Sequence, residues 1–135
     1  MANESAPWRA LAPHFLSLLR LIAGLLLLEF GTMKVLHFPY DDYFAGVPVM
    51  SLFWIAGVIE LIGGALVTVG LYTRLAAFIL SGEMAFAYFM EHAPQGFYPA
   101  LNKGLPAVLF CFTFLYLSAA GPGPWSLDRL FRKVP

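Results

Sequence analysis

The stretch MSLFWIAGVIELIGGALVTVG, residues 50–70, decides the fold class because it is almost wholly apolar and long enough to cross a membrane. A hydrocarbon core of about 30 Å needs roughly 20 helical residues at a rise of about 1.5 Å each. Because no water is available there, the backbone must satisfy its own hydrogen bonds, which favours an α-helix. Glu60 interrupts this stretch, and a charge at that depth costs roughly 3 kcal/mol on insertion scales.

Three more apolar stretches of similar character lie along the chain. The four predicted spans cover residues 14–36, 50–70, 74–91 and 102–120. We therefore predict an all-α protein, an antiparallel bundle of four transmembrane helices that forms one membrane domain over residues 1–135. Charged side chains embedded in the spans are Arg20, Glu29, Glu60 and Glu83.

Turn and cap residues mark the ends of the spans. Gly70 suits the left-handed position that closes the second span, and Thr73 is predicted to cap the third. Pro106 falls in the first turn of the fourth span, where a missing N–H is tolerated. Ser126 is predicted to cap a short C-terminal amphipathic helix, with Asp128 near the positive end of its dipole.

The composition excludes several classes of protein. Hydrophobic residues make up 60% of the chain and charged residues 12%, which fits neither a solvated globular surface nor disorder. A net charge of zero gives no indication of nucleic-acid binding. The single cysteine, Cys111, can form neither an internal disulfide nor a CxxC redox pair. The first span is too long for a signal-peptide core, so we expect it to be retained.

Basic residues predict the orientation of the spans. Four spans place both termini and the turn at residues 72–74 on one side of the membrane. The basic residues of that side are Arg9, Arg74, Arg129, Arg132 and Lys133. Only Lys34 and Lys103 lie on the other side, so the positive-inside rule places both termini in the cytoplasm of a bacterial or archaeal cell.

Glu60 and Glu83 are predicted to lie close together. Both lie about 15–18 Å along their helices from the turn at residues 72–74, and those helices are antiparallel neighbours. Gly57, Gly63 and Gly64 share a helical face with Glu60, which suits close helix packing. Two carboxyls at close range in a low dielectric would share a proton or a cation. The alternative is a protonated, hydrogen-bonded pair that only braces the bundle.

The first span cannot direct all its charges inward. At about 100° per residue, Arg20 and Lys34 fall on one stripe with Gly24 and Gly31, whereas Glu29 lies about 180° from Arg20. We therefore predict that Arg20 and Lys34 face the bundle interior and that Glu29 faces a partner subunit or the lipid. Neither cation is expected at the depth of the two carboxyls.

Further polar residues gather toward the outer side. Together with the embedded charges, the candidate ligand-binding residues are Glu60, Glu83, Arg20, Lys34, Tyr88, His92 and Asn102. His37 and His92 could hold a metal with a carboxylate, but their spacing matches no known site, and the alternative is two surface histidines. No metal is therefore predicted, and no catalytic residue is singled out. Nucleophile triads, phosphate-binding glycine loops and nucleotide motifs are absent from the sequence.

The order and spacing of several short motifs resemble the DoxX family of small four-helix membrane proteins. These motifs are LEFGTMK at 28–34, GVIELIGG at 57–64, GLYTR at 70–74, MAFAYF at 84–89, HAPQGF at 92–97 and GPGPWSLD at 121–128. The chain departs from the family pattern at Phe30, where a histidine is frequent. It departs again at Leu105 and Pro106, where an acidic residue is expected.

The resemblance implies a membrane subunit tied to redox chemistry, because relatives are linked with quinone-coupled thiosulfate oxidation and with complexes against oxidative stress. It implies no intrinsic cofactor apart from a quinone, and an oxidoreductase partner, soluble or in the membrane. The alternative is a non-catalytic membrane scaffold, or a protein that binds or transports a small solute. A homo-oligomer is compatible with both interpretations.

Overall fold

The computed structural model describes residues 7–133, and within that range the chain is helical with turns and loops and has no strand. The α-helices are α1 (Pro7–Val35), α2 (Leu52–Val69), α3 (Thr73–Ala87), α4 (Pro99–Asn102) and α5 (Leu105–Ala120). Two π-helical turns, η1 (Tyr88–His92) and η3 (Asp128–Arg132), and one 3-10 turn, η2 (Ala93–Gln95), complete the chain. The prediction of an all-α protein is confirmed.

Two of the predicted spans are long and apolar enough as helices to cross a membrane. These are α1 with 29 residues and α2 with 18. The helix α5 is apolar but shorter, with 16 residues, and α3 has 15 before the chain continues into η1. The prediction of four full spans is therefore confirmed in part.

Three helix bounds differ from the bounds of the predicted spans. The first helix begins at Pro7 rather than at residue 14. Pro13 lies in its second turn, where a proline leaves only one carbonyl, close to the start of the helix, without its N–H partner, so the helix tolerates it. The third ends as an α-helix at Ala87 rather than at residue 91. From Tyr88 to His92 the helix continues with π-helical hydrogen bonds. The fourth begins at Leu105, since Lys103 adopts a left-handed conformation with φ 64°.

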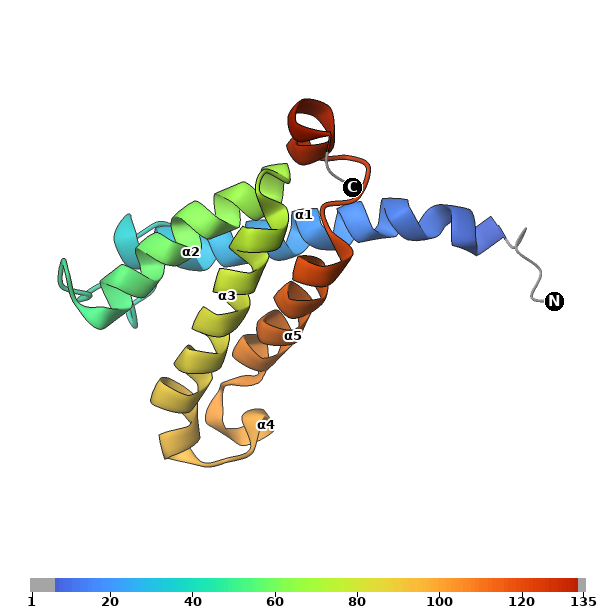
Figure 1. Cartoon of the computed structure of the whole chain (residues 1–135). Helices are drawn as coiled ribbons and strands as arrows, with labels where there is room; N and C mark the ends of the chain where they lie inside the picture. Colours follow the sequence, from blue (N-terminus) through green and yellow to red (C-terminus); the bar gives the residue numbers. More distant parts are fainter. Residues whose placement is uncertain (1–6, 134–135) are drawn as a thin grey trace.

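The helices form two hairpins that diverge from one end. The helix α1 packs along α2, and α3 packs along α5, while α2 and α3 contact each other less extensively. Figure 1 shows the two hairpins meeting near the α2–α3 turn and separating toward their other ends. We call the end with the α2–α3 turn and the C-terminal segment the terminal end. The opposite end, with residues 36–51 and 88–104, is the loop end.

Glycines let α1 and α2 approach with their backbones almost in contact. A Cβ added at Gly64 would lie 2.8 Å from the backbone nitrogen of Leu28, and one added at Gly31 would lie 2.5 Å from that of Leu61. Small residues at helical spacing are what permits such an approach. The predicted small-residue faces of both helices are therefore confirmed as the α1–α2 contact.

All four long helices contribute to one apolar core, which lies in the half of the molecule nearer the terminal end. Its buried residues are Ala23, Leu27, Val67, Ala76, Ala77, Leu80, Met84, Phe114 and Leu117. Ser81 joins α3 to α5 by donating a hydrogen bond from its Oγ to the Cys111 carbonyl, at 2.7 Å. The hairpins thus pack together toward the terminal end and diverge toward the loop end.

Asp128 caps α3 from the C-terminal segment. Gly70 closes α2 in the predicted left-handed conformation, with φ 74°. The predicted cap by Thr73 is wrong, because Asp128 Oδ1 and Oδ2 accept the N–H groups of Tyr72 and Thr73 at 2.7 and 2.9 Å. Ser126 forms its predicted cap by accepting the N–H of Arg129 at 3.2 Å.

Arg20 fastens the C-terminal segment to α1. Its guanidinium, 2% exposed as a residue, donates to the carbonyls of Pro122 and Trp125, the latter at 2.8 Å. A weaker bond at 3.4 Å reaches the Thr68 carbonyl of α2. The inward orientation predicted for Arg20 is confirmed, and its partners are three backbone carbonyls at the terminal end.

Replacing Gly64 by alanine is expected to destabilise the protein by about 1–3 kcal/mol, because the new methyl group would meet the α1 backbone. Gly82→Ala is the matched control, since a Cβ at Gly82 meets nothing within 4 Å. That variant should be neutral or slightly stabilising. Thermal unfolding in a mild detergent measures both, and equal melting temperatures would contradict the proposed α1–α2 packing.

The cap by Asp128 should make stability depend on pH. Burial alone raises the pKa of its carboxyl, but the hydrogen bonds from Thr73, Tyr72 and Arg132 lower the pKa by more, so it lies below its usual value. With a folded pKa below the unfolded one, the stabilisation is complete above the unfolded pKa and is lost as pH falls through the folded pKa. Asp128→Asn should therefore be less stable than the wild type near neutral pH, by about 1–3 kcal/mol.

Below about pH 4 this difference in unfolding free energy should narrow, because the wild-type carboxyl itself becomes protonated. Melting curves of the wild type and Asp128→Asn over that pH range test the expectation. A difference that does not change with pH would show that the carboxylate charge is irrelevant to the cap.

Candidate functional site

A buried ion pair joins the first two helices. Lys34, near the end of α1, donates from Nζ to both carboxylate oxygens of Glu60 in α2, each at 2.8 Å. The two side chains are 11% and 1% exposed. The inward orientation predicted for Lys34 is confirmed. The expectation that it lies at a different depth from Glu60 is wrong, because the long side chain extends from the loop end to the carboxylate.

Glu83 of α3 lies beside this ion pair. The charges of Glu60 and Lys34 both act on its carboxyl, so the predicted proximity of the two glutamates is present in the structure. Both carboxyl oxygens of Glu83 are buried, and neither has a hydrogen-bond partner within residues 7–133. A buried carboxyl without a donor is costly, so Glu83 needs a hydrogen-bond partner that the described chain does not supply.

A cavity of about 480 Å³ opens between the two hairpins toward the loop end, and Lys34 and Glu60 form part of its wall. Most of the wall is apolar and rich in aromatic rings. The aromatic residues that line it are Phe30, Tyr43, Phe44, Phe53 and Phe110. Polar residues stand around its outer part, namely Asp41, Glu91, His92, Gln95, Asn102 and Lys103. The cavity thus combines a mainly apolar interior with one buried, hydrogen-bonding wall.

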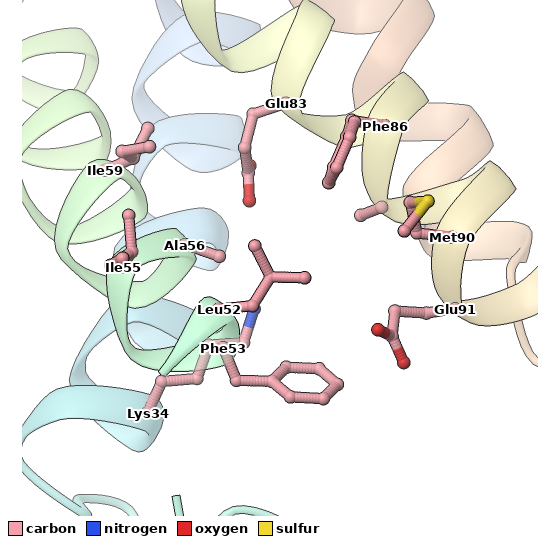
Figure 2. Close-up of a pocket in the computed structure, with 11 residues that line it drawn as sticks. Lys34, Leu52, Phe53, Ile55, Ala56, Ile59, Glu83, Phe86, Met90 and Glu91 are labelled. Atoms are coloured by element: carbon pink, nitrogen blue, oxygen red, sulfur yellow. The ribbon is translucent and has the colours of Figure 1, made fainter. Parts of the chain in front are cut away.

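A smaller cavity of about 140 Å³ lies between α2 and the α3–η1 segment. Figure 2 shows the side chains of Glu83 and Glu91 both directed into it, with Ile59, Ala56 and Ile55 of α2 opposite. Lys34 and Glu91 line both cavities. The cluster of Lys34, Glu60 and Glu83 therefore lies where the two cavities approach each other.

Tyr88, His92 and Asn102 form a hydrogen-bonded network at the loop end. The amide nitrogen of Asn102 donates to the Tyr88 hydroxyl at 3.2 Å and to the Gly96 carbonyl at 2.6 Å. The Tyr88 hydroxyl donates to the Phe97 carbonyl. His92 Nδ1 lies 3.1 Å from the Asn102 carbonyl. These bonds order the segment between η1 and α5, which carries the outer wall of the larger cavity.

The structure separates the remaining candidates from this site. Arg20 is bonded to carbonyls at the terminal end, remote from the carboxyl pair. Glu29 is exposed, as predicted. His37 does not line either cavity, whereas His92 lines the larger one. Within residues 7–133 no group of three or more His, Cys, Asp or Glu side chains is placed to hold a metal.

Two features of the site were not predicted from the sequence. The π-helical turn η1 directs Glu91 toward Glu83, and no sequence pattern distinguishes such a turn from an α-helix. The second feature is the divergence of the hairpins, which creates the larger cavity. Phe30 and Pro106 both line this cavity and contribute apolar surface to its wall.

Comparison with known proteins agrees with this membrane architecture. The family model for DoxX matches residues 15–93. The chain belongs to the DoxX family. The chain is also similar to two bacterial proteins. One, an uncharacterised protein of Haemophilus influenzae, is 42% identical over 90% of this chain and 93% of its own length.

The other is an uncharacterised membrane protein of Mycobacterium tuberculosis, 30% identical over 85% of this chain and 80% of its own length. No solved structure matches the chain. Family membership and the apolar helices together identify a membrane protein.

Removing Lys34 alone should be strongly destabilising, because it leaves Glu60 buried without its cation. We expect Lys34→Met to lower the free energy of unfolding by roughly 3–5 kcal/mol, whereas Lys34→Met combined with Glu60→Leu should restore most of the loss. Lys103→Met is the control, since that lysine is exposed and should change stability by less than about 0.5 kcal/mol. Unfolding in detergent measures all three, and a double variant no better than the single one would contradict the pairing.

Proposed function

We propose that this DoxX protein binds the headgroup of a quinone in the larger cavity and acts as the membrane subunit of a quinone-linked oxidoreductase or oxidative-stress complex. The observation that carries the proposal is the position of the Lys34–Glu60 ion pair, which is buried and forms part of the wall of a mainly apolar cavity lined in part by aromatic rings. A quinone headgroup is flat and apolar over its faces and has carbonyl oxygens at its edges. A cavity of this kind offers both surfaces that such a molecule needs.

Lys34 has hydrogen-bonding capacity to spare. An ammonium group has three N–H donors, and the two oxygens of Glu60 occupy two of them. The remaining donor can bind a carbonyl oxygen of the ligand. Because Glu60 holds the ammonium from the other side, Lys34 needs no reorganisation to bind a carbonyl, which favours binding. Phe44, whose ring centroid lies 5.5 Å from Nζ, covers the same region with an aromatic face.

The carboxyls give the site a means to handle protons. Reduction of a quinone to a quinol takes up two electrons and two protons. Glu83 lies next to the ion pair and can donate or accept a proton there, which is the role of a general acid or base. The chain has one cysteine and no CxxC pair, so in this proposal the electrons come from or go to a partner oxidoreductase.

The proposed location is the plasma membrane of a bacterium or archaeon, crossed four times, with both termini in the cytoplasm. The arrangement of basic residues supports this orientation. The terminal end carries the α2–α3 turn and the C-terminal segment, which include Arg74, Arg129, Arg132 and Lys133, whereas Lys34 and Lys103 belong to the loop end. A second copy of the chain could complete the lipid-facing surface in a homo-oligomer.

The competing function is a non-catalytic scaffold or a protein that binds or transports a small solute. Two observations favour it: the ion pair is satisfied within the chain, and the Tyr88–Asn102 network is bonded to backbone carbonyls. Both can serve stability alone. Ligand binding and support of the bundle therefore have to be measured separately.

Protein purified in a mild detergent should contain extractable quinone, and after its removal should bind ubiquinone-1 or menadione. We expect Glu60→Gln and Glu83→Gln to weaken binding at least ~10-fold, which corresponds to about 1.4 kcal/mol, because they remove ionisation while keeping side-chain shape. Glu29→Gln, on the exposed face of α1, should bind as the wild type does. Quenching of tryptophan fluorescence by the added quinone provides the measurement.

A second variant separates binding from folding. Ala107 lines the larger cavity without belonging to the ion pair, so Ala107→Phe should fill the cavity and abolish quinone binding while leaving the charges in place. If no quinone co-purifies or binds, or if Glu60→Gln, Glu83→Gln and Ala107→Phe all bind normally, the proposed function is wrong and the scaffold interpretation remains.

A further inference from the structure

The cluster at the meeting of the two cavities has an unbalanced formal charge. Two carboxylates, Glu60 and Glu83, face one ammonium, Lys34, and Glu60 already takes that ammonium with both oxygens. Glu83 is left with two buried oxygens and no donor in the described chain. The neighbouring group is a second carboxylate, Glu60, so Glu83 needs a hydrogen of its own to share with it. A proton meets this need, and a carboxylic O–H on Glu83 can donate to its neighbour Glu60.

A second carboxyl reaches the same cavity because of the π-helical turn. Glu91 follows Glu83 by eight residues, and in a continuous α-helix it would lie about 80° around the axis from it. In η1 the hydrogen bonds close wider turns, each residue advances less around the axis, and Glu91 comes closer to the face of Glu83. Figure 2 shows both side chains entering the smaller cavity. Inserted π turns of this kind are frequent at functional sites.

The smaller cavity spans the distance between the two carboxyls. Eight residues of helix correspond to about 12 Å, which is too long for a direct proton transfer. The cavity of about 140 Å³ has room for several water molecules, each of which takes about 30 Å³ in the liquid. The polar groups that line it are Lys34 from α1, Glu83 from α3 and Glu91 from η1, and the side facing α2 is apolar. A water chain there has polar contacts at its two ends and apolar walls between them.

We propose that Glu83 exchanges a proton with the loop end of the protein through the smaller cavity, with Glu91 as the entry and exit group. The O–H bond of Glu83 breaks as its proton passes to a water of the chain, and an O–H bond forms on the Glu91 carboxylate at the other end. The reverse sequence returns a proton to Glu83. Only protons move along the route, and no electron is transferred. Lys34 compensates part of the negative charge that Glu83 gains when it loses its proton, whereas the neighbouring Glu60 carboxylate opposes that loss.

This route supplies protons to the ligand site and in that respect rests on the proposed function. It approaches the carboxyl cluster along the smaller cavity, between α2 and the α3–η1 segment, whereas the ligand would occupy the larger cavity between the hairpins. Glu91 lines both cavities, so the outer end of the route lies beside the ligand site.

Infrared spectroscopy of the ligand-free protein tests the route without any quinone. A protonated carboxyl has a C=O band well separated from the amide bands, and the band shifts when D₂O replaces H₂O. We expect the wild type to show such a band, and Glu83→Gln to lack it. Glu91→Gln should keep the band but exchange its proton for deuterium at least ~10-fold more slowly. Glu29→Gln, the control on α1, should match the wild type in both measurements.

A variant that leaves every carboxyl in place shows whether slower exchange comes from a blocked cavity rather than from misfolding. Ala56 lines the smaller cavity from α2, so Ala56→Leu should narrow it and slow the exchange while the band persists. The proposal is wrong if Glu83→Gln retains the full band, or if both Glu91→Gln and Ala56→Leu exchange at the wild-type rate. A wild-type band with carboxyl-dependent exchange in a protein that binds no quinone would retain the route and refute only the quinone site.

Discussion

The close approach of α1 and α2 is the constraint on which the rest of this structure depends. Gly64 and Gly31 allow the two backbones to meet, and only at that separation can Lys34 place its ammonium group 2.8 Å from both oxygens of Glu60. In a solvent without water, an ammonium and a carboxylate must find each other within the protein, because the lipid offers neither of them a partner. Packing and electrostatics are therefore not separate contributions here. The small residues set the distance, and the distance makes the charges tolerable.

The same contact leaves the site with more acidic than basic side chains, and this imbalance determines its chemistry. One cation is shared between two acids, and it is committed to the acid on the neighbouring helix. Glu83 belongs to the other hairpin, which diverges from the first toward the loop end (Figure 1). Glu83 therefore takes no part in the ion pair, but it lies close enough for both charges of the pair to act on its carboxyl. That combination suits a group that changes its protonation while its surroundings stay in place.

The sequence was informative where a side chain's position follows from helical periodicity. The stripe of Arg20, Gly24, Gly31 and Lys34 and the outward position of Glu29 were predicted from 100° per residue and are present. The sequence was not informative where a segment far away along the chain binds backbone N–H groups that a local residue could also bind. Thr73 has the right residue type for a cap, but a carboxylate 55 residues away takes the backbone donors.

Lys34 illustrates a related error, since the depth of a Cα does not give the depth of a flexible side chain. The π turn at Tyr88–His92 depends on hydrogen bonds five residues apart, and neither residue type nor spacing announces it. For these reasons the carboxyl pair could be predicted, but the two cavities and the part played by Glu91 could not.

The clamp made by Arg20 has a consequence for how the protein is made. Its partners Pro122 and Trp125 follow it by 102 and 105 residues. At typical synthesis rates the ribosome needs about 5–20 s to add that length of chain. During this interval the guanidinium in the first helix has at most the Thr68 carbonyl of the second as a native partner. The terminal end is thus completed only after Pro122 and Trp125 have been synthesised, and a nascent chain that stops short of them carries an arginine in its first span with most of its native hydrogen bonds missing.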